Sequence, residues 1–181
     1  MKIIENLLPW NSQLETRSED DVKLIVVHCT ELPTLSQARQ VAEESVEDNS
    51  GGCVSGHYYI DKDGAAYRYV EDRRIANHTK GHNRSSIGIE IVNSGRYPKW
   101  FVSTNQTPVE EYPLIQIETV KELIRSLRNR FPGIKELARH SDLDQRMVPA
   151  EDDPSILIRR RIDPGPLFPW NEVLQSFLDQ Q

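Results

Sequence analysis

The chain has 181 residues, which is long enough for a single domain to bury a hydrophobic core without disulfide or metal cross-links. Hydrophobic residues make up 37% and charged residues 28%, as in an ordinary globular protein. The net charge of −6 argues against nucleic acid as a partner, because phosphates attract basic surfaces. It also gives no attraction to an anionic polymer or lipid surface, and it favours a small soluble ligand.

The N-terminal segment, MKIIENLLPWNSQLETRSEDD, contains no apolar run of signal-peptide length. No stretch approaches the roughly 20 apolar residues of a membrane span. Cys29 and Cys53 form no CxxC pair and do not indicate a disulfide framework. We therefore expect no membrane partner and a cytoplasmic location, with release or export without a leader as the alternative. A monomer is expected, although the sequence does not define the oligomeric state.

The first clear element is Val22–Cys29, which is β-branched and apolar almost throughout and predicts a buried central strand. Thr34–Gln37 has a capping-box pattern that predicts a helix reaching about Val46. The turn-rich segment Asp48–Gly52 follows. These patterns place a helix directly after the first central strand.

A hairpin and a second central strand are expected next. His57–Ile60 and Ala65–Val70 flank Asp61–Gly64, whose composition is typical of a hairpin turn. Ser86–Val92 then alternates strictly, so its three isoleucines share one face and Glu90 lies on the other.

A long helical pattern begins near Pro113, which can occupy a first turn, and Gly133 can end it. Its apolar positions recur at helical spacing at Ile117, Val120, Ile124, Leu127 and Phe131.

Ile134–Ala138 predicts a short strand that carries His140 to its end, and Asn171–Leu178 predicts a closing amphipathic helix. Strands and helices are interleaved, and no repeat or linker interrupts them. We therefore expect one α/β domain over residues 1–181, with a mixed central β-sheet flanked by helices on both faces.

Some residues of these elements could carry chemistry. A catalytic zinc ion usually has three protein ligands and a fourth position for water. His28 and His140 end predicted strands, where a histidine is more often a hydrogen-bonded core residue. Asp163 could be a turn residue before proline, and Glu90 a solvated side chain. The residue types alone therefore leave a zinc site undecided.

Four segments together resemble the type-2 N-acetylmuramoyl-L-alanine amidase family, which includes AmpD-like amidases, amidase-type phage lysozymes and peptidoglycan recognition proteins. They occur in family order within a motif-bearing core of about residues 22–178. The segment NHTKGHN (77–83) also resembles the pocket wall of the family. The four segments are VVHCT (26–30), SIGIEIVN (86–93), ARHSDL (138–143) and DPGPLFPW (163–170).

The resemblance implies a peptidoglycan recognition protein-like fold and one zinc ion per chain, held by His28, His140 and Asp163. Such a centre lowers the pKa of a bound water toward ~7 and polarises a substrate carbonyl. The resemblance also implies that Glu90 is the general acid–base. Cys29 follows a ligand on a strand, so its side chain should point away from the metal.

Arg161 stands where many members have a lysine that stabilises the oxyanion, and arginine keeps the positive charge. Because Arg159 and Arg160 precede it, the register is open, and each of the three could be a solvated loop charge.

His57, His78 and Asn83 match positions near the substrate groove of the family. The two histidines could contact the peptide, support a metal ligand or make structural hydrogen bonds only. His82 is expected at the surface, and none of the histidines at 57, 78 and 82 is expected to bind metal.

Two segments depart from the family pattern. Asp163 follows His140 at a longer interval than in many relatives, so Gln145–Ile158 is interpreted as an inserted surface loop that can act as a lid. Asn93–Tyr112 contains Tyr97, Trp100 and Phe101, which could stack on sugars or pack against the sheet.

The resemblance implies a hydrolase that cleaves the amide bond between N-acetylmuramic acid and L-alanine, in peptidoglycan or in anhydro-muropeptide fragments. The alternative is a binding module without the metal, but such a module would not need His28, His140, Asp163 and Glu90 together. A structural zinc domain is disfavoured because it prefers four Cys or His ligands. The acidic composition favours muropeptide recycling over a lysis enzyme or exported effector.

Overall fold

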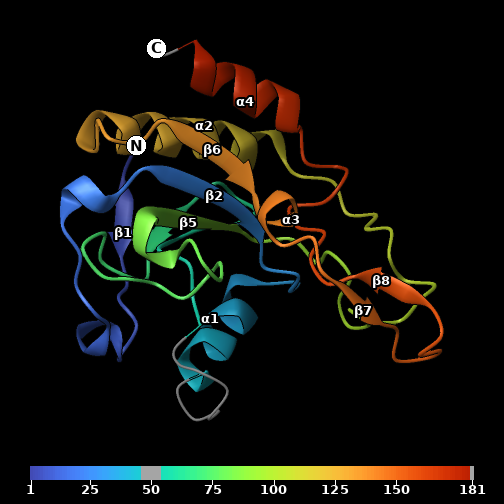
Figure 1. The fold of residues 1–181 in the computed structure, drawn as a ribbon. Coiled ribbons are helices and arrows are strands. Elements are labelled where there is room, and N and C mark those ends of the chain that lie inside the picture. Colours follow the sequence, from blue (N-terminus) through green and yellow to red (C-terminus); the bar gives the residue numbers. More distant parts are fainter. Residues whose placement is uncertain (46–53, 180–181) are drawn as a thin grey trace.

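A computed structural model describes residues 1–45 and 54–179 (Figure 1). Its centre is a six-stranded sheet with the order β1-β4-β3-β5-β2-β6. The β3–β4 pair is antiparallel, and the other neighbouring pairs of this sheet are parallel. The strands are β1 (Ile3–Glu5), β2 (Leu24–Cys29), β3 (Tyr58–Ile60), β4 (Ala66–Arg68), β5 (Ser86–Ile91) and β6 (Glu136–Arg139).

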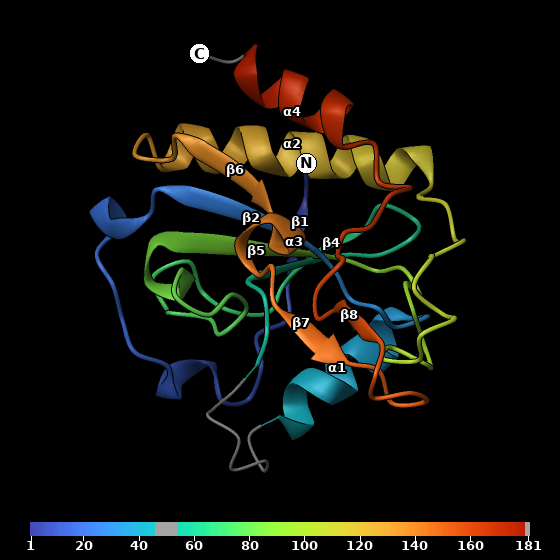
Figure 2. The ribbon, with the colours of Figure 1, turned by 45° about the vertical axis from the view of Figure 1, so that its right-hand side comes forward.

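Helices cover both faces of this sheet. Two of them, α2 and α4, are stacked on one face, and α1 lies on the other (Figures 1 and 2). The expected α/β architecture with a mixed sheet between helices is therefore confirmed. In the described part of the chain no helix is long and apolar enough to cross a membrane. The helices are α1 (Leu35–Glu44), α2 (Leu114–Arg130), α3 (His140–Leu143) and α4 (Trp170–Leu178), with 3-10 turns at Asn11–Gln13, Glu19–Asp21 and Asn83–Ser85.

The larger core lies between the sheet and α2. Alternation along β5 turns Ile87, Ile89 and Ile91 to this side, and all three are fully buried. They pack in one cluster with α2 residues such as Val120 and Ile124, as the helical spacing predicts. Burial of each such side chain contributes about 1.5–3 kcal/mol. The opposite face of the sheet is thereby free to carry polar groups at the ends of its strands.

The helix α1 begins where the capping pattern predicts. The Thr34 hydroxyl accepts a hydrogen bond from the Gln37 N–H at 3.2 Å. The Gln37 side chain accepts from the same hydroxyl at 3.0 Å, so the reciprocal bond of a full capping box is not formed. The predicted helix end at Val46, the turn Asp48–Gly52 and Cys53 lie outside the described residues.

Three boundaries differ from the expectation. The strand β1 has three residues and no alternating pattern, and it exists through parallel pairing with β4. The helix α2 ends at Arg130, not at Gly133, because Phe131 precedes a proline and is driven out of the helical conformation, with φ −118° and ψ 83°. The strand β6 begins at Glu136, two residues later than predicted, where its pairing with Leu24 starts.

The segment Gln145–Ile158, expected as an inserted surface loop, has a regular structure that the sequence analysis did not predict. The segment forms an antiparallel hairpin of β7 (Met147–Pro149) and β8 (Leu157–Arg159), which lies beside the end of the main sheet (Figure 1). Its turn is attached to the preceding long loop, because Glu151 N–H donates to the Phe101 carbonyl at 2.8 Å. The Ser103 N–H and hydroxyl both donate to Asp152 at 2.7 Å.

We expect Ile89→Ala to lower the free energy of unfolding by about 2–5 kcal/mol, because it leaves a cavity in the sheet–α2 core. Ile156→Ala, at the exposed hairpin, should change it by less than about 0.5 kcal/mol. Urea denaturation of both variants measures the difference. Equal losses would contradict the assignment of the core to the α2 face.

Candidate metal centre and active site

The register of the sheet aligns polar side chains on the α1 face. His28 lies opposite Glu90 in the β2–β5 pair, and Tyr59 lies opposite Glu90 in the β3–β5 pair. Residues opposite one another in register share a face. Arg139, the last residue of β6, pairs with the residue before His28, so His140 follows beside it. His28 and His140, which are 112 positions apart in the sequence, are thereby placed at one edge of the sheet.

Three side chains converge at this edge. His28 Nδ1 lies 3.0 Å from His140 Nδ1 and 3.2 Å from Asp163 Oδ2. The His140 Nδ1–Asp163 Oδ2 distance is 3.0 Å. Ligands of a tetrahedral zinc ion at about 2.0–2.1 Å lie roughly 3.3 Å apart. All three residues are buried, and among the described residues they form a group that could hold a metal ion.

The unshared oxygen of Asp163 supports the same interpretation. Asp163 Oδ1 is buried and has no hydrogen-bond partner in the described chain. Buried oxygens normally have a partner, so this atom suits an additional ligand or water at the centre. Two imidazole nitrogens and one carboxylate form the donor set of a three-ligand catalytic zinc site.

His28 and Asp163 are in the protonation states that metal binding requires. Burial, with repulsion from His140 and Arg161, lowers the pKa of His28 to about 4, so its imidazole is neutral at pH 7. Burial alone would raise the pKa of Asp163, but hydrogen bonds from His140 and His28 hold it well below its usual range. A carboxylate and a neutral ring therefore face the centre.

A chain of hydrogen bonds behind His28 sets its tautomer. Ser86 Oγ lies 2.7 Å from the His82 carbonyl, which can only accept, so the hydroxyl proton points there. Ser86 then accepts from His78 Nε2 at 3.2 Å, and His78 Nδ1 accepts from His28 Nε2 at 3.0 Å. The lone pair of His28 is left on Nδ1, toward the centre.

His78 thus supports His28, and support of a histidine of the centre is one of the roles that the sequence left open. Its ring lies against Gly88, where a Cβ would come within 2.6 Å of His78 Cγ, so only glycine leaves room for it. The sequence analysis missed Ser86 and also Thr79, whose hydroxyl lies 3.1 Å from His78 Nδ1 and 3.3 Å from His28 Nε2. Ser86 shares a strand face with Gly88 and Glu90, so alternation along β5 was the available signal.

His57 does not reach the groove. It is fully buried, its Nδ1 accepts from the Gly88 N–H at 3.0 Å, and its Nε2 lies 3.1 Å from the Arg74 carbonyl. Two cavities adjoin the centre, a larger one of about 470 Å³ and a smaller one of about 240 Å³, and His57 lines neither of them. Of the roles that the sequence left open for His57, these contacts fit structural hydrogen bonding and not substrate contact.

Asn83 shapes the wall of the groove. Its Oδ1 accepts from the N–H groups of His78 and Thr79 at 3.1 and 2.7 Å, and it lines the larger cavity. Cys29 points away from the centre, as alternation predicts, and its thiol donates to the Asn93 carbonyl at 3.3 Å. Burial raises the pKa of this thiol above its usual range.

Glu90 stands next to the three converging groups. Its Oε1 lies 4.0 Å from His28 Nδ1, and the side chain is 14% exposed. Burial and the neighbouring Asp163 raise the pKa of Glu90 to about 8, while Arg161 opposes the shift. A carboxyl group whose pKa lies near neutrality is suited to both take up and release a proton.

The three consecutive arginines have different partners. Arg159 donates to the Ser141 carbonyl, and Arg160 donates to Asp144 Oδ2 at 2.7 Å. Arg161 lines both cavities at the centre, and its buried Nε has no hydrogen-bond partner in the described residues. Arg160 also lines the cavity of about 470 Å³, but of the three only Arg161 borders both cavities.

A groove of two unlike arms crosses the centre. One cavity, of about 470 Å³, is polar and includes Lys80, Arg146, Arg160 and one acid, Asp144. The other, of about 240 Å³, is lined on its outer side by apolar residues of α1 and its surroundings. The two cavities share Val54, His78, His140 and Arg161. Those apolar residues are Leu32, Ala38, Val41, Ala42 and Val54.

A buried His–His–Asp group with a neighbouring carboxylate at the ends of parallel strands is an arrangement suited to metal-dependent hydrolysis. Residues 18–166 match the family model N-acetylmuramoyl-L-alanine amidase. The chain belongs to this family. A comparison with curated protein sequences gave no match.

Solved structures share the fold. The N-acetylmuramoyl-L-alanine amidase LysC from Clostridium intestinale URNW is 23% identical, with a TM-score of 0.71 over 98% of both chains. The Ph2119 endolysin of a Thermus scotoductus bacteriophage is 21% identical, with a TM-score of 0.64 over 97% of this chain and 99% of that chain. AmiD from E. coli, in complex with anhydro-N-acetylmuramic acid-L-Ala-D-gamma-Glu-L-Lys, is 23% identical, with a TM-score of 0.63 over 86% of this chain and 57% of that chain.

Ser86→Ala removes the acceptor that orients His78, and we expect it to weaken Zn²⁺ affinity by about 10–100-fold, the usual cost of losing an outer partner of a ligand. The matched control is Ser85→Ala, because the Ser85 hydroxyl donates to the His82 carbonyl at 3.3 Å and not to His78. Competition with a chromogenic chelator measures both affinities. Equal affinities in the two variants would contradict the tautomer assignment.

Proposed function

We propose that the protein is a zinc-dependent N-acetylmuramoyl-L-alanine amidase that acts on soluble muropeptides. The observation that carries the proposal is the convergence of His28 Nδ1, His140 Nδ1 and Asp163 Oδ2 within 3.0–3.2 Å, beside Glu90, in a chain of this family. The complete set also distinguishes the proposal from a module that only binds muropeptides, which would not require these four groups together.

His28, His140 and Asp163 would hold the ion. Zinc, when bound, supplies a Lewis acid that polarises the scissile carbonyl and lowers the pKa of water toward ~7. Two neutral rings and one carboxylate leave a net positive centre. The buried walls exclude bulk water, which strengthens each electrostatic interaction within the site.

Glu90 moves the proton. Its carboxylate takes a proton from the attacking water and delivers it to the leaving nitrogen of L-alanine, which must leave as a neutral amine. Arg161 lines both cavities at the centre, and its guanidinium donates to the oxygen that becomes negative as the carbonyl is attacked. Arginine offers a planar fork of donors for this purpose.

The arms of the groove favour a small substrate with peptide carboxylates. Lys80, Arg146 and Arg160 make one arm basic although the net charge of the chain is −6. A γ-linked glutamate, as in the ligand of AmiD, keeps a free α-carboxylate that such an arm would attract.

The apolar arm suits the sugar and its lactyl group. The acidic turn of the β7–β8 hairpin, Glu151–Asp153, disfavours a polyanionic wall polymer. The proposed role is therefore recycling of anhydro-muropeptides in the cytoplasm.

The decisive experiment compares the purified protein on soluble anhydro-muropeptides and on intact sacculi, with products identified by mass. Faster release of free peptide from the soluble fragments is expected. Cleavage of sacculi alone would indicate a lysis enzyme, and binding without cleavage would indicate a recognition module.

Metal analysis of protein purified without added zinc should find about one zinc per chain. His28→Ala and His140→Ala should lose both the metal and the activity, while His82→Ala, whose ring is outside the site, should keep both. Full activity of metal-free protein would rule out the mechanism.

Glu90→Gln should retain zinc and the fold but lower kcat by about 10²–10⁴-fold, the usual contribution of a general acid–base. The amide keeps the size of the side chain and cannot carry the proton. Steady-state kinetics on an anhydro-muropeptide, with zinc content measured in the same samples, provide the test. A kcat close to that of the parent would leave Glu90 with a structural role only.

A further inference from the structure

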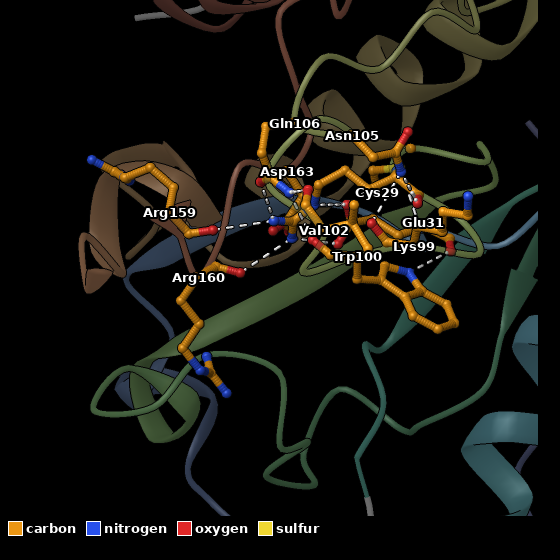
Figure 3. A network of polar contacts seen from close by, with 12 residues as sticks. Cys29, Glu31, Lys99, Trp100, Val102, Asn105, Gln106, Arg159, Arg160 and Asp163 are labelled. Carbon is orange, nitrogen blue, oxygen red and sulfur yellow. Dashed lines mark hydrogen bonds and ion pairs between the residues drawn. The ribbon is translucent and has the colours of Figure 1, made fainter. Parts of the chain in front are cut away.

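The buried guanidinium of Arg96 is a second centre of polar contacts, and Figure 3 labels its partners Glu31, Gln106, Arg159 and Arg160. Arg96 is 1% exposed, and each of its five guanidinium N–H groups has an acceptor. Nε and Nη2 donate to the two carboxylate oxygens of Glu31 at 2.7 and 2.9 Å. The remaining donors reach Gln106 Oε1 at 3.0 Å and the carbonyls of Arg159 and Arg160, both at 3.1 Å.

These acceptors belong to the segments that carry the site. Glu31 lies three residues after His28, Arg96 follows β5, which carries Glu90, and Arg159 ends β8. The Arg160 carbonyl is part of the peptide group that joins Arg160 to Arg161. Its hydrogen bond to Arg96 therefore fixes the orientation of the backbone from which the Arg161 side chain departs.

The neighbourhood of Glu31 is built to hold it in this pairing. Glu31 has a φ of +49°, which is unusual for a residue with a side chain. Its carbonyl accepts from Trp100 Nε1 at 3.1 Å. A Cβ at Gly95 would come within 2.7 Å of Glu31 Cγ, so the glycine lets the carboxylate approach Arg96.

We propose that Arg96, paired with Glu31, is a positioning residue for the reaction, which holds the Arg159–Arg161 backbone so that Arg161 faces the scissile carbonyl. The inference rests on the proposed function for the role of Arg161. A lysine at this position keeps the charge but has its three donors on one nitrogen, so it cannot hold Glu31 and both carbonyls at once.

The variants are Arg96→Lys, Arg161→Met and the double variant. The matched control is Arg128→Met. Arg128 also donates to a backbone carbonyl, that of Phe177, and its guanidinium lies 4.3 Å from the centre of the Phe177 ring. These contacts join α2 to α4, far from the site. Steady-state kinetics are measured on zinc-loaded protein with an anhydro-muropeptide. Amide hydrogen exchange of residues 157–165 is measured with and without zinc.

Arg96→Lys should lower kcat by roughly 10–100-fold with little change in KM, which is part of the loss expected for an oxyanion donor. The double variant should be no slower than Arg161→Met within about threefold, because both changes remove one function. Arg128→Met should combine multiplicatively with Arg161→Met. Exchange at 159–161 should become faster in Arg96→Lys and remain unchanged in Arg128→Met.

Multiplicative effects of Arg96→Lys and Arg161→Met, or unchanged exchange at 159–161, would overturn the proposal. If Arg161→Met itself leaves kcat unchanged, the proposed role of Arg161 is wrong, and exchange still decides whether Arg96 holds this segment. If Arg96→Lys does not fold, Glu31→Asp replaces it, because aspartate keeps the buried charge and tolerates a positive φ.

Discussion

The contact of the buried Asp163 carboxylate with the imidazoles of His28 and His140 imposes the strictest condition on this molecule. A buried charge that loses its partner typically costs 3–5 kcal/mol, so the three groups can be buried only together. They come from separate elements, and one of them lies in a loop. The rest of the structure brings the ends of these elements to one point and turns the correct ring nitrogens toward it.

Parallel strand pairing is the main feature that brings these residues together. Because β2, β5 and β6 run in the same direction, their carboxyl ends lie at one edge, and the side chains that follow each strand meet there. One face of the sheet is filled by isoleucines against α2. The other face can therefore bear Ser86, Gly88 and Glu90 without a cost to the core. A single strand thus supplies core packing on one side and, on the other, the support of His28 and a carboxylate.

Asp163 and Arg161 do not lie in a strand. Polar contacts between loops position them instead. The buried Arg96–Glu31 pair, the β7–β8 hairpin and the Asp144 contacts with Arg146 and Arg160 hold the approach to the centre. Arg161 lines both cavities of the groove, and its buried Nε has no hydrogen-bond partner in the described chain. These contacts also produce a local excess of positive charge in an acidic protein, which allows a small anionic ligand to be attracted while an anionic surface is not.

Local patterns in the sequence determined the elements and placed two of the three converging residues, His28 and His140, at the ends of strands. The alternation of Ser86–Val92, the apolar run that ends at His28 and the helical spacing through Phe131 each reflect a face that must be buried. For that reason the fold class and the positions of His28, His140 and Glu90 at strand ends could be predicted. Family motifs added Asp163 and Arg161. Only the tertiary structure decided that His57 is buried, that His78 supports His28 through Ser86, and that the inserted segment is a hairpin docked on Phe101 and Ser103. The pairing of Arg96 with Glu31 was also visible only in the tertiary structure. The partners of a polar side chain depend on which distant segments lie beside it, and hydrophobic periodicity does not encode the positions of distant segments.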